Sequence, residues 1–244
     1  MLDIDLHYSW QQKGGVHTNV FRSHYKAHIG EGLTSILGKS GEGKSTLLTL
    51  LGGFVQGRGS IQYYGRELIK LAPDERPVTN LFQQDNLFPQ LTVWQNIAIG
   101  LSNSLRLTDA QMQTVNWALE RTKLTAYANS KPDELSGGQA QRVAIARAIS
   151  RAAVGDSSSK KSILLLDEPF SALDPKLRMD MMLLVKELTQ QLSLTTLLVS
   201  HFPDEVKTIG GQFLLIEGGS VVLQDSVELL SAENIPVALH TYLK

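Results

Sequence analysis

One stretch of the sequence, Gly38 to Ser45, has the residue types and spacing of a site that binds phosphate. It fits the pattern G-x-x-x-x-G-K-[ST] and reads Gly38-Lys39-Ser40-Gly41-Glu42-Gly43-Lys44-Ser45. Glycines let the backbone curl so that its N–H groups point inward, and a helix that follows presents its positive end to the phosphates. Lys44 would reach the β- and γ-phosphates, and the Ser45 hydroxyl suits Mg²⁺, which prefers oxygen ligands. The segment predicts a nucleotide site.

A pair of acids, Asp167 and Glu168, follows the aliphatic run from Ile163 to Leu166. The first carboxylate can hold Mg²⁺ through water, and the second can orient or deprotonate an attacking water. Taken alone, the pair is equally compatible with a plain polar strand end. The guanine-binding pattern Asn-Lys-x-Asp is absent from the sequence, so nothing singles out a GTPase.

A second candidate anion site lies at Leu135-Ser136-Gly137-Gly138-Gln139, directly before a helical pattern. A serine and two glycines at a helix N-terminus leave backbone N–H groups available to an anion. The same residues can simply cap the helix. The segment therefore indicates a helix start, and its function depends on context.

The elements that must position these residues follow from the hydrophobic pattern. Short aliphatic runs alternate with helical stretches, which is typical of an α/β domain with a largely parallel sheet. We predict strands over Leu33–Leu37, Ile163–Leu166 and Thr195–Val199, and a helix over Lys44–Leu51. Asp174 can cap a further helix between the last two strands, with an apolar stripe at Leu177, Met181, Leu184 and Leu188.

Three other segments complete the organisation. From Thr92 to Lys131 the pattern is helical, with Met112, Val115 and Leu119 on one face, and this predicts a helical subdomain inserted over about residues 90–135. Gly218-Gly219 between two apolar runs predicts a hairpin. Residues 155–161 are small and polar, and we expect a flexible surface loop there.

Composition narrows the class of protein. The 244 residues carry a net charge of -1 and no cysteine, with a mean hydropathy of -0.07. These values are typical of a globular protein, and they exclude disulfides, zinc–thiolate sites and cysteine nucleophiles. The near-neutral charge argues against a nucleic-acid partner. No apolar run is long enough to span a membrane, and acids near the N-terminus argue against a signal peptide. We expect an intracellular protein.

Six elements in order make the chain resemble the nucleotide-binding subunits of ABC transporters, over nearly its whole length. Besides the phosphate loop, they are a glutamine loop at Gln83, the signature Leu135 to Gln139, the acidic strand Ile163 to Glu168, a D-loop Ser171-Ala172-Leu173-Asp174, and a switch histidine, His201. The resemblance implies one ABC ATPase domain over residues 1–244. Its RecA-like core would have a mainly parallel sheet, joined by an N-terminal antiparallel β part and the helical insertion.

The resemblance also implies a mechanism and partners. Two subunits form a head-to-tail homodimer, and each ATP lies between one phosphate loop and the other subunit's signature and D-loop. Within one chain, ATP contacts residues 38–45, Thr46 and an N-terminal aromatic, Tyr8 or Trp10. Glu168 is the general base, His201 contacts the γ-phosphate, and Gln83 binds Mg²⁺ or water. The residues that contact ATP in trans are Ser136, Gly137, Gly138, Gln139 and Asp174, and the Mg²⁺ set is Ser45, Gln83 and Asp167.

The stretch Ala72 to Leu101 most resembles the ATPases of thiamine importers. The resemblance implies ATP hydrolysis that drives uptake through a polytopic permease, with a solute-binding protein as an indirect partner. The subunit would lie peripherally at the cytoplasmic face of the inner membrane. Import of another solute, molybdate or iron(III), and a soluble ABC ATPase without a membrane partner remain alternatives. Exposed Leu87 and Phe88 would suit contact with a permease, or they pack internally.

Overall fold

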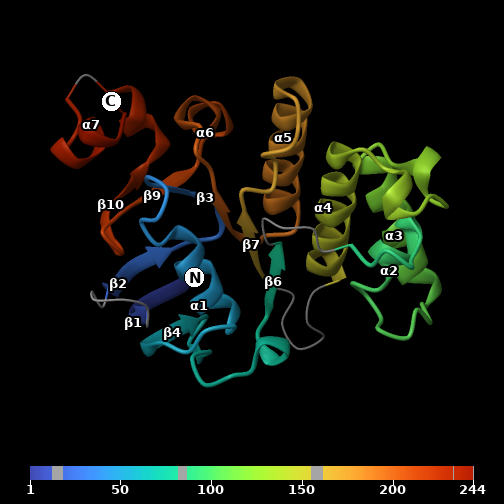
Figure 1. Ribbon diagram of the computed structural model, residues 1–244, viewed down its shortest axis with the longest axis horizontal. Helices are drawn as coiled ribbons and strands as arrows, with labels where there is room; N and C mark the ends of the chain where they lie inside the picture. Colours follow the sequence, from blue (N-terminus) through green and yellow to red (C-terminus); the bar gives the residue numbers. More distant parts are fainter. Residues whose placement is uncertain (13–18, 82–86, 155–161, 233, 244) are drawn as a thin grey trace. The chain divides into compact units, whose positions relative to one another are not determined.

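A computed structural model describes residues 1–12, 19–81, 87–154, 162–232 and 234–243. The chain divides into two compact units (Figure 1). The first comprises Met1–Val78 and Thr195–Lys244, and the second Thr79–Leu194. Among the described residues, no helix has both the length and the apolarity required to cross a bilayer.

The first unit contains most of the strands. They are β1 (Leu2–Gln12), β2 (Asn19–Ile29), β3 (Gly32–Leu37), β4 (Arg58–Tyr63), β5 (Arg66–Glu67), β8 (Thr195–Val199), β9 (Gln212–Glu217) and β10 (Ser220–Ser226). Its α-helices are α1 (Lys44–Gly52), α6 (Pro203–Ile209) and α7 (Val237–Leu243). The second unit contains β7 (Ile163–Asp167) and the helices α2 (Val93–Ala98), α3 (Asp109–Arg121), α4 (Gly137–Val154) and α5 (Pro175–Gln191). The short strand β6 (Val78–Leu81) begins at Val78, the last residue of the segment Met1–Val78 of the first unit, and its other residues belong to the second unit.

The strands of the first unit follow the order β5-β4-β1-β2-β10-β9-β3-β8. Parallel pairing joins β3 to both β8 and β9, whereas β1 pairs antiparallel with β2 and with β4. β10 connects the two parts, because it pairs antiparallel with β9 and parallel with β2. The predicted parallel core and N-terminal antiparallel part are therefore both present.

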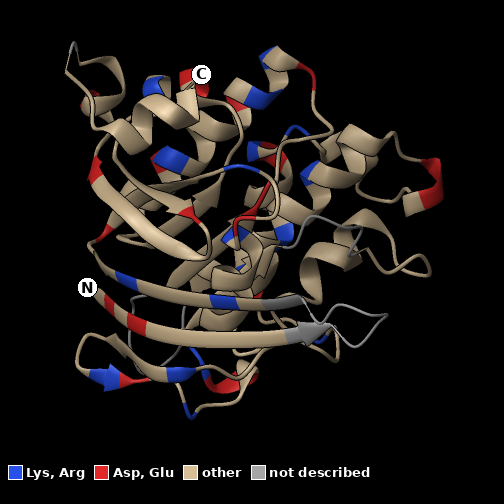
Figure 2. Cartoon of the chain, turned by 60° about the vertical axis from the view of Figure 1, so that its left-hand side comes forward, with Lys and Arg blue, Asp and Glu red and all other residues tan. Residues whose placement is uncertain are grey.

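The long hairpin β1–β2 separates an apolar face from a polar face. Every second residue of each strand points to the same side, and Leu2, Ile4 and Leu6 on β1 are buried, as are Tyr25 and Ile29 on β2. The intervening residues form an outer face with charged and histidine side chains. Figure 2 shows the two strands side by side, with acidic residues on β1 and basic residues on β2.

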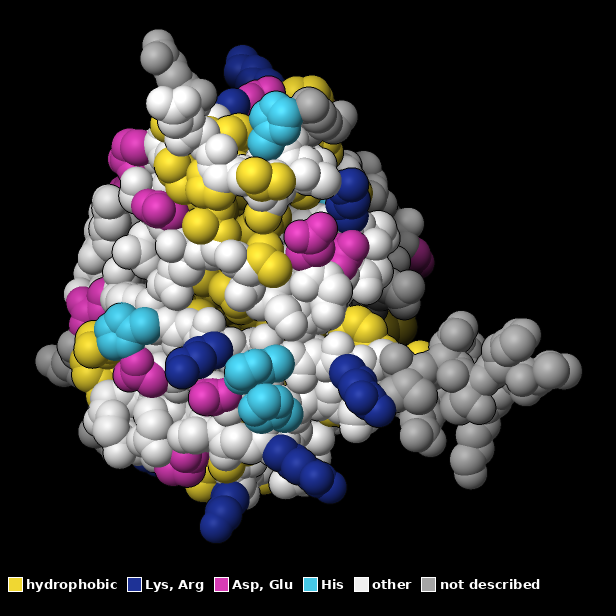
Figure 3. Space-filling model, turned by 90° about the vertical axis from the view of Figure 1, so that its left-hand side faces the viewer, with side chains coloured by type: hydrophobic (Ala, Val, Ile, Leu, Met, Phe, Trp, Pro, Cys, Tyr) yellow, Lys and Arg dark blue, Asp and Glu magenta, His cyan; other side chains and the backbone are white. Residues whose placement is uncertain are grey.

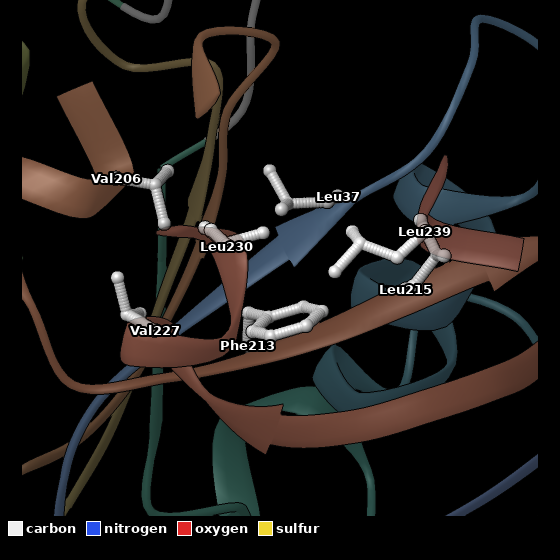
Figure 4. Packing of buried hydrophobic residues seen from close by; sticks show 7 residues of the cluster. All are labelled: Leu37, Val206, Phe213, Leu215, Val227, Leu230 and Leu239. Atoms are coloured by element: carbon white, nitrogen blue, oxygen red, sulfur yellow. The ribbon is translucent and has the colours of Figure 1, made fainter. Parts of the chain in front are cut away.

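A cluster of seven apolar residues forms part of the core of the first unit (Figure 4). It joins β3, α6, β9, the 3-10 helix Val227–Ser231 and α7, and consists of Leu37, Val206, Phe213, Leu215, Val227, Leu230 and Leu239. Burial of each such side chain stabilises the fold by roughly 2 kcal/mol. Leu37 is the last residue before the phosphate loop, so this cluster fixes the point from which the loop departs.

The second unit contains the predicted helical segment. Helices α2, α3 and α4 pack against one another (Figure 1). In α3, Val115 and Leu119 are buried, but Met112 is 38% exposed. The predicted face of α3 is therefore buried at Val115 and Leu119 but exposed at Met112. Met112 lies in the first turn of α3, and burial of the stripe begins one turn later.

The arginine Arg76 is buried and ties four backbone carbonyls together. Its guanidinium donates to the oxygens of Leu50 and Leu51 at 2.8 Å, and to those of Ile69 and Leu71 at 3.1 Å. Two of these carbonyls belong to the last turn of α1, where Leu50 also accepts from the N–H of Gly53 at 3.2 Å. Burial lowers the pKa of Arg76, yet arginine remains charged at neutral pH. Arg76 therefore caps the helix that follows the phosphate loop.

We expect Arg76→Met to reduce the free energy of unfolding by about 3 kcal/mol, because buried carbonyls lose a charged donor. Urea denaturation followed by circular dichroism measures the change. Arg66→Met removes an exposed arginine of β5 and is the matched control, for which we expect less than about 0.5 kcal/mol. Equal effects of the two substitutions would show that Arg76 is not a cap.

Candidate nucleotide site

The phosphate loop connects β3 to α1 in the first unit, as the sequence predicts. Gly38 has φ of 150° and Gly43 has φ of 98°. A Cβ atom on Gly38 would lie 2.4 Å from the backbone oxygen of Ile216, and one on Gly43 would lie 2.5 Å from the hydroxyl of Tyr25. Both positions therefore require glycine for steric as well as conformational reasons.

Lys44 is buried and bends back over its own loop. Its Nζ donates to the backbone oxygens of Gly38 and Lys39, both at 2.8 Å. The side chain thus braces the loop and places a positive charge beside it. Gly43, the N-cap residue of α1, makes no side-chain hydrogen bond to the helix, and the N-terminus of a helix attracts anions through its first N–H groups. Ser45 is exposed in this first turn, and Thr46 is half-buried.

The turn between β9 and β10 supports the loop from a distant part of the sequence. Gly218 and Gly219 have φ of 54° and 75°, as a tight two-residue hairpin requires. The N–H of Gly219 donates to the backbone oxygen of Glu42 at 3.1 Å, and the N–H of Gly218 donates to the Glu42 carboxylate. Glu42 is thereby held inside the loop by its backbone and its side chain.

Tyr25 of β2 anchors the phosphate loop through a buried hydrogen bond. Its side chain is fully buried, and its hydroxyl donates to the backbone oxygen of Gly43 at 2.8 Å. Burial raises the pKa of Tyr25, so the hydroxyl keeps the proton that it donates. Sequence reasoning did not identify this residue, because its contact depends on the pairing of β2 within the sheet.

We expect Tyr25→Phe to destabilise the protein by about 1 kcal/mol, since Gly43 loses one of its hydrogen-bond donors in a buried place. ATP affinity should fall less than tenfold, because the N–H of Leu47 still donates to the same oxygen at 3.0 Å. Thermal unfolding and calorimetric ATP titration measure the two effects. Tyr127→Phe is the control, because that residue is 36% exposed. An unchanged melting temperature for Tyr25→Phe would contradict the anchoring role.

The two N-terminal aromatics that are candidates for contact with adenine differ in their exposure. Tyr8 is half-buried, and Trp10 is 50% exposed. The ring of Phe21, the strand partner of Trp10, lies beside the loop, where a Cβ on Gly43 would be 2.9 Å from its Cζ atom. Phe21 is thus a further aromatic at the loop that sequence reasoning missed.

The exposed His201 follows β8, at the same sheet edge as the phosphate loop. β3 and β8 are parallel neighbours in which Ile36 pairs with Val199. The N–H of Ser200 also donates to the oxygen of Ile36 at 3.3 Å. Since parallel strands end at the same edge, the first unit brings the switch histidine and the phosphate loop to one end of the sheet.

The acid pair lies in the second unit, at the end of the fully buried strand β7. Asp167 is 5% exposed, and Glu168 is half-buried. Glu168 has φ of 49°, a conformation that costs a non-glycine residue of order 1 kcal/mol. Such strained residues cluster at functional sites, because the surrounding structure holds them in a required orientation. The predicted base is therefore held in a strained backbone conformation.

The signature segment forms a capped start of α4 in the second unit. The Ser136 hydroxyl accepts from the N–H of Gln139 at 3.3 Å, and the Gln139 side chain accepts from the N–H of Ser136 at 2.7 Å. This reciprocal cap is the arrangement of a capping box. The cap orders the segment while leaving space at Gly137, since no atom of another element lies within 4 Å of a Cβ built on it.

The D-loop is tied to the signature helix within the second unit. The side chain of Gln141 accepts from the N–H of Ala172 at 3.1 Å, and Gly138 faces Leu173 closely. Asp174 caps α5 as predicted, because its carboxylate accepts from the N–H of Leu177 at 3.0 Å. The sequence analysis assigned no role to Gln141, because this contact depends on how α4 and the D-loop pack. Gln83 and the predicted loop at 155–161 lie outside the described residues.

Comparisons with known proteins show which family this chain belongs to. A family model described as ABC transporter matches residues 25–171. The thiamine import ATP-binding protein of Rhizobium meliloti (strain 1021) is 39% identical over 212 residues, which is 86% of each chain. The protein of the same description from Haemophilus influenzae (strain 86-028NP) is 46% identical over 188 residues, covering 77% of this chain and 84% of that protein.

A solved structure shares the fold over almost the whole chain. It is the dimeric ATP-binding cassette MJ0796 in a post-hydrolysis state bound to ADP and Pi, with a TM-score of 0.78 and 28% identity. The match covers 93% of this chain and 99% of that one. The predicted fold class, including the antiparallel part and the helical insertion, is thus confirmed.

Proposed function

The chain belongs to the ABC transporter family, and from that premise we propose that it is the ATP-hydrolysing subunit of an importer that takes up thiamine. The observation that carries the ATPase assignment is the phosphate loop, which leads directly into the N-terminus of α1 and which the Lys44 side chain braces through the oxygens of Gly38 and Lys39. Support for thiamine comes from relatives such as that of Vibrio parahaemolyticus serotype O3:K6 (strain RIMD 2210633). This thiamine import ATP-binding protein is 36% identical over 241 residues, covering 98% of this chain and 97% of that one.

In the proposed site, the phosphates of ATP lie on the loop backbone and the first turn of α1. Residues 38–45 and Thr46 surround them, and Lys44 shifts its hydrogen bonds from loop carbonyls to phosphate oxygens. Tyr8, Trp10 and Phe21 are the aromatics available to the adenine, and the position of Phe21 beside Gly43 supports its inclusion.

The residues proposed for Mg²⁺ fit its chemistry, since all of them offer oxygen. They are the exposed hydroxyl of Ser45, the carboxylate of Asp167 and the side chain of Gln83. When bound, the ion neutralises charge that develops on the phosphates. Glu168 orients and deprotonates the attacking water, and His201 contacts the γ-phosphate.

The proposed working unit is a homodimer. The signature residues Ser136, Gly137, Gly138 and Gln139, together with Asp174 of the D-loop, contact ATP bound to the partner's phosphate loop. The capped start of α4 supports this role, because the cap fixes the conformation of a helix N-terminus, and the positive end of a helix attracts anions. ATP binding would close the dimer, and hydrolysis would release it to do work on the membrane subunits.

The proposed contact with the permease lies at Leu87 and Phe88. Phe88 is 40% exposed, although its backbone is fixed by Asn96, whose amide nitrogen donates to the Phe88 oxygen at 3.1 Å. The Arg147 guanidinium also lies 5.8 Å from the centre of the Phe88 ring. An apolar ring presented on a rigid turn suits a membrane subunit that docks there. The chain would then be held peripherally at the cytoplasmic face of the inner membrane.

The test is purification of the tagged protein with its partners from detergent-solubilised native membranes, with identification by mass spectrometry. We expect a polytopic permease, and proteoliposomes containing the complex should accumulate labelled thiamine only when ATP is supplied on the side of the ATPase. Molybdate and iron(III) assayed in parallel provide the solute controls. Uptake of another solute would contradict the thiamine assignment, and recovery of only soluble partners would contradict the importer.

A further inference from the structure

A group of metal-binding side chains lies on the outer face of the β1–β2 hairpin, away from the proposed nucleotide site. We propose that Asp5, His7 and His24 together bind one divalent transition-metal ion of the Zn²⁺ or Ni²⁺ type. One ligand atom from each residue lies within 4.8 Å of the other two. Figure 3 shows this face, on which histidine side chains lie side by side next to an acidic group.

The strand pairing explains why these side chains converge. His7 and His24 are direct partners in the antiparallel register. The N–H of His24 points away from β1 and donates to the oxygen of Gly219, in the turn before β10, at 3.0 Å, so the two histidines form a non-hydrogen-bonded pair. In such pairs the side chains approach most closely. Their rings are stacked with centroids 4.0 Å apart and planes inclined by 13°.

Asp5 completes the group because it precedes His7 by two residues and shares its face of the sheet. The Nε2 atom of His24 lies 2.8 Å from Oδ1 of Asp5, and the Nε2 atom of His7 lies 3.7 Å from the same oxygen. Both imidazoles therefore direct Nε2 toward one carboxylate. An ion at bonding distances of about 2.0–2.2 Å requires only rotations of these exposed side chains.

The donor set selects the class of ion. Two imidazoles and one carboxylate suit Zn²⁺, Ni²⁺, Co²⁺ or Cu²⁺, whereas Mg²⁺ and Ca²⁺ prefer oxygen ligands only. Water would fill the remaining coordination positions, because the two histidines are exposed. Binding of the ion would replace the contact between His24 and Asp5, because a ring nitrogen must be free of its proton to bind a metal.

Basic residues on the same face limit the affinity. Lys26 is paired with Asp5, Arg58 with His7 and Arg22 with Ser9. Their positive charges oppose a bound cation, although solvent screens exposed charges strongly. Next along the same face, His28 contacts Asp3. That pair offers only two ligand groups and so provides an internal control.

Strand β2 links the proposed metal site to the proposed nucleotide site. His24 on the outer face is followed by Tyr25 on the buried face, which donates to Gly43 of the phosphate loop. An ion that fastens His24 to β1 therefore restrains the strand that supports the loop. Metal binding should raise the melting temperature of the nucleotide-free protein, because the ion binds only the folded hairpin.

The experiment uses the full-length, tag-free protein after chelation and dialysis, without nucleotide. Calorimetric titration with ZnCl₂, and separately with NiCl₂, should give one strong site per chain. His24→Ala, His7→Ala and Asp5→Asn should each weaken it by at least about tenfold. His28→Ala, which removes an exposed histidine of the same strand, should bind as the wild type does.

Two results would overturn the proposal. One is that the wild-type protein binds no stoichiometric metal ion at about 100 μM, a concentration at which a specific site should be occupied. The other is equal loss of binding in His28→Ala and His24→Ala, which would indicate scattered surface histidines. Circular dichroism and ATP titration of each variant distinguish loss of the metal site from loss of the fold, and neither result bears on the ATPase assignment.

Discussion

Lys44→Ala is expected to weaken ATP binding by at least about 100-fold, because it removes two or more charge-assisted hydrogen bonds worth about 1.5–3 kcal/mol each. In the nucleotide-free protein, Nζ of Lys44 donates to the oxygens of Gly38 and Lys39. The substitution therefore also removes the brace that preserves the loop shape. Calorimetric titration with ATP and Mg²⁺ measures the affinity directly.

The matched control for this substitution is Lys70→Ala. Lys70 is an exposed lysine of the same unit, outside the phosphate loop. Lys70→Ala changes the net charge of the protein by the same amount, so a loss of ATP affinity that depends only on net charge should appear in both variants. If Lys44→Ala binds ATP as tightly as Lys70→Ala does, the phosphate-loop assignment is wrong.

The second large effect is expected from Glu168→Gln, which should lower the rate of ATP hydrolysis by about 10²–10⁴-fold while ATP binding persists. Glutamine keeps the size and hydrogen-bonding capacity of the side chain but cannot accept the proton of the attacking water. Because the nucleotide is no longer consumed, a dimer with bound ATP should accumulate. Phosphate release measures the rate, and size-exclusion chromatography with ATP measures the association.

Glu120→Gln, an exposed acid in α3, provides the comparison with the same change of charge. It should hydrolyse ATP and associate like the wild type. A Glu168→Gln protein that remains monomeric with ATP would refute the proposed sandwich of nucleotide between two subunits. A variant that hydrolyses at the wild-type rate would instead remove Glu168 from the role of general base.

The parts of the fold that local pattern determines could be predicted from the sequence. The strand Thr195–Val199 was predicted at its observed bounds, and the helix after the phosphate loop was predicted one residue too short. Both have strong local signals, a continuous aliphatic run or a glycine-rich turn before a helix. The Asp174 cap was predicted for the same reason, since an acid before a proline marks a helix start.

The features that were missed depend on contacts between distant segments. Phe21 and Tyr25 reach the phosphate loop only because β2 lies where the sheet places it. A buried arginine such as Arg76 leaves no periodic signal, since its partners are carbonyls in other turns. Met112 shows a limit of local pattern. Helical periodicity indicates which residues share a face, but it does not indicate how much of that face other elements cover.

The β9–β10 turn has a consequence for protein engineering. Short exposed hairpin turns are usually good places to insert a tag or fluorescent reporter. Here the backbone N–H groups of Gly218 and Gly219 hold Glu42, and a Cβ on Gly219 would lie 2.7 Å from the oxygen of Arg22. An insertion at this turn would therefore release the phosphate loop from its rear support. A reporter should therefore be inserted at another position, because this turn holds the phosphate loop in place through its hydrogen bonds to Glu42.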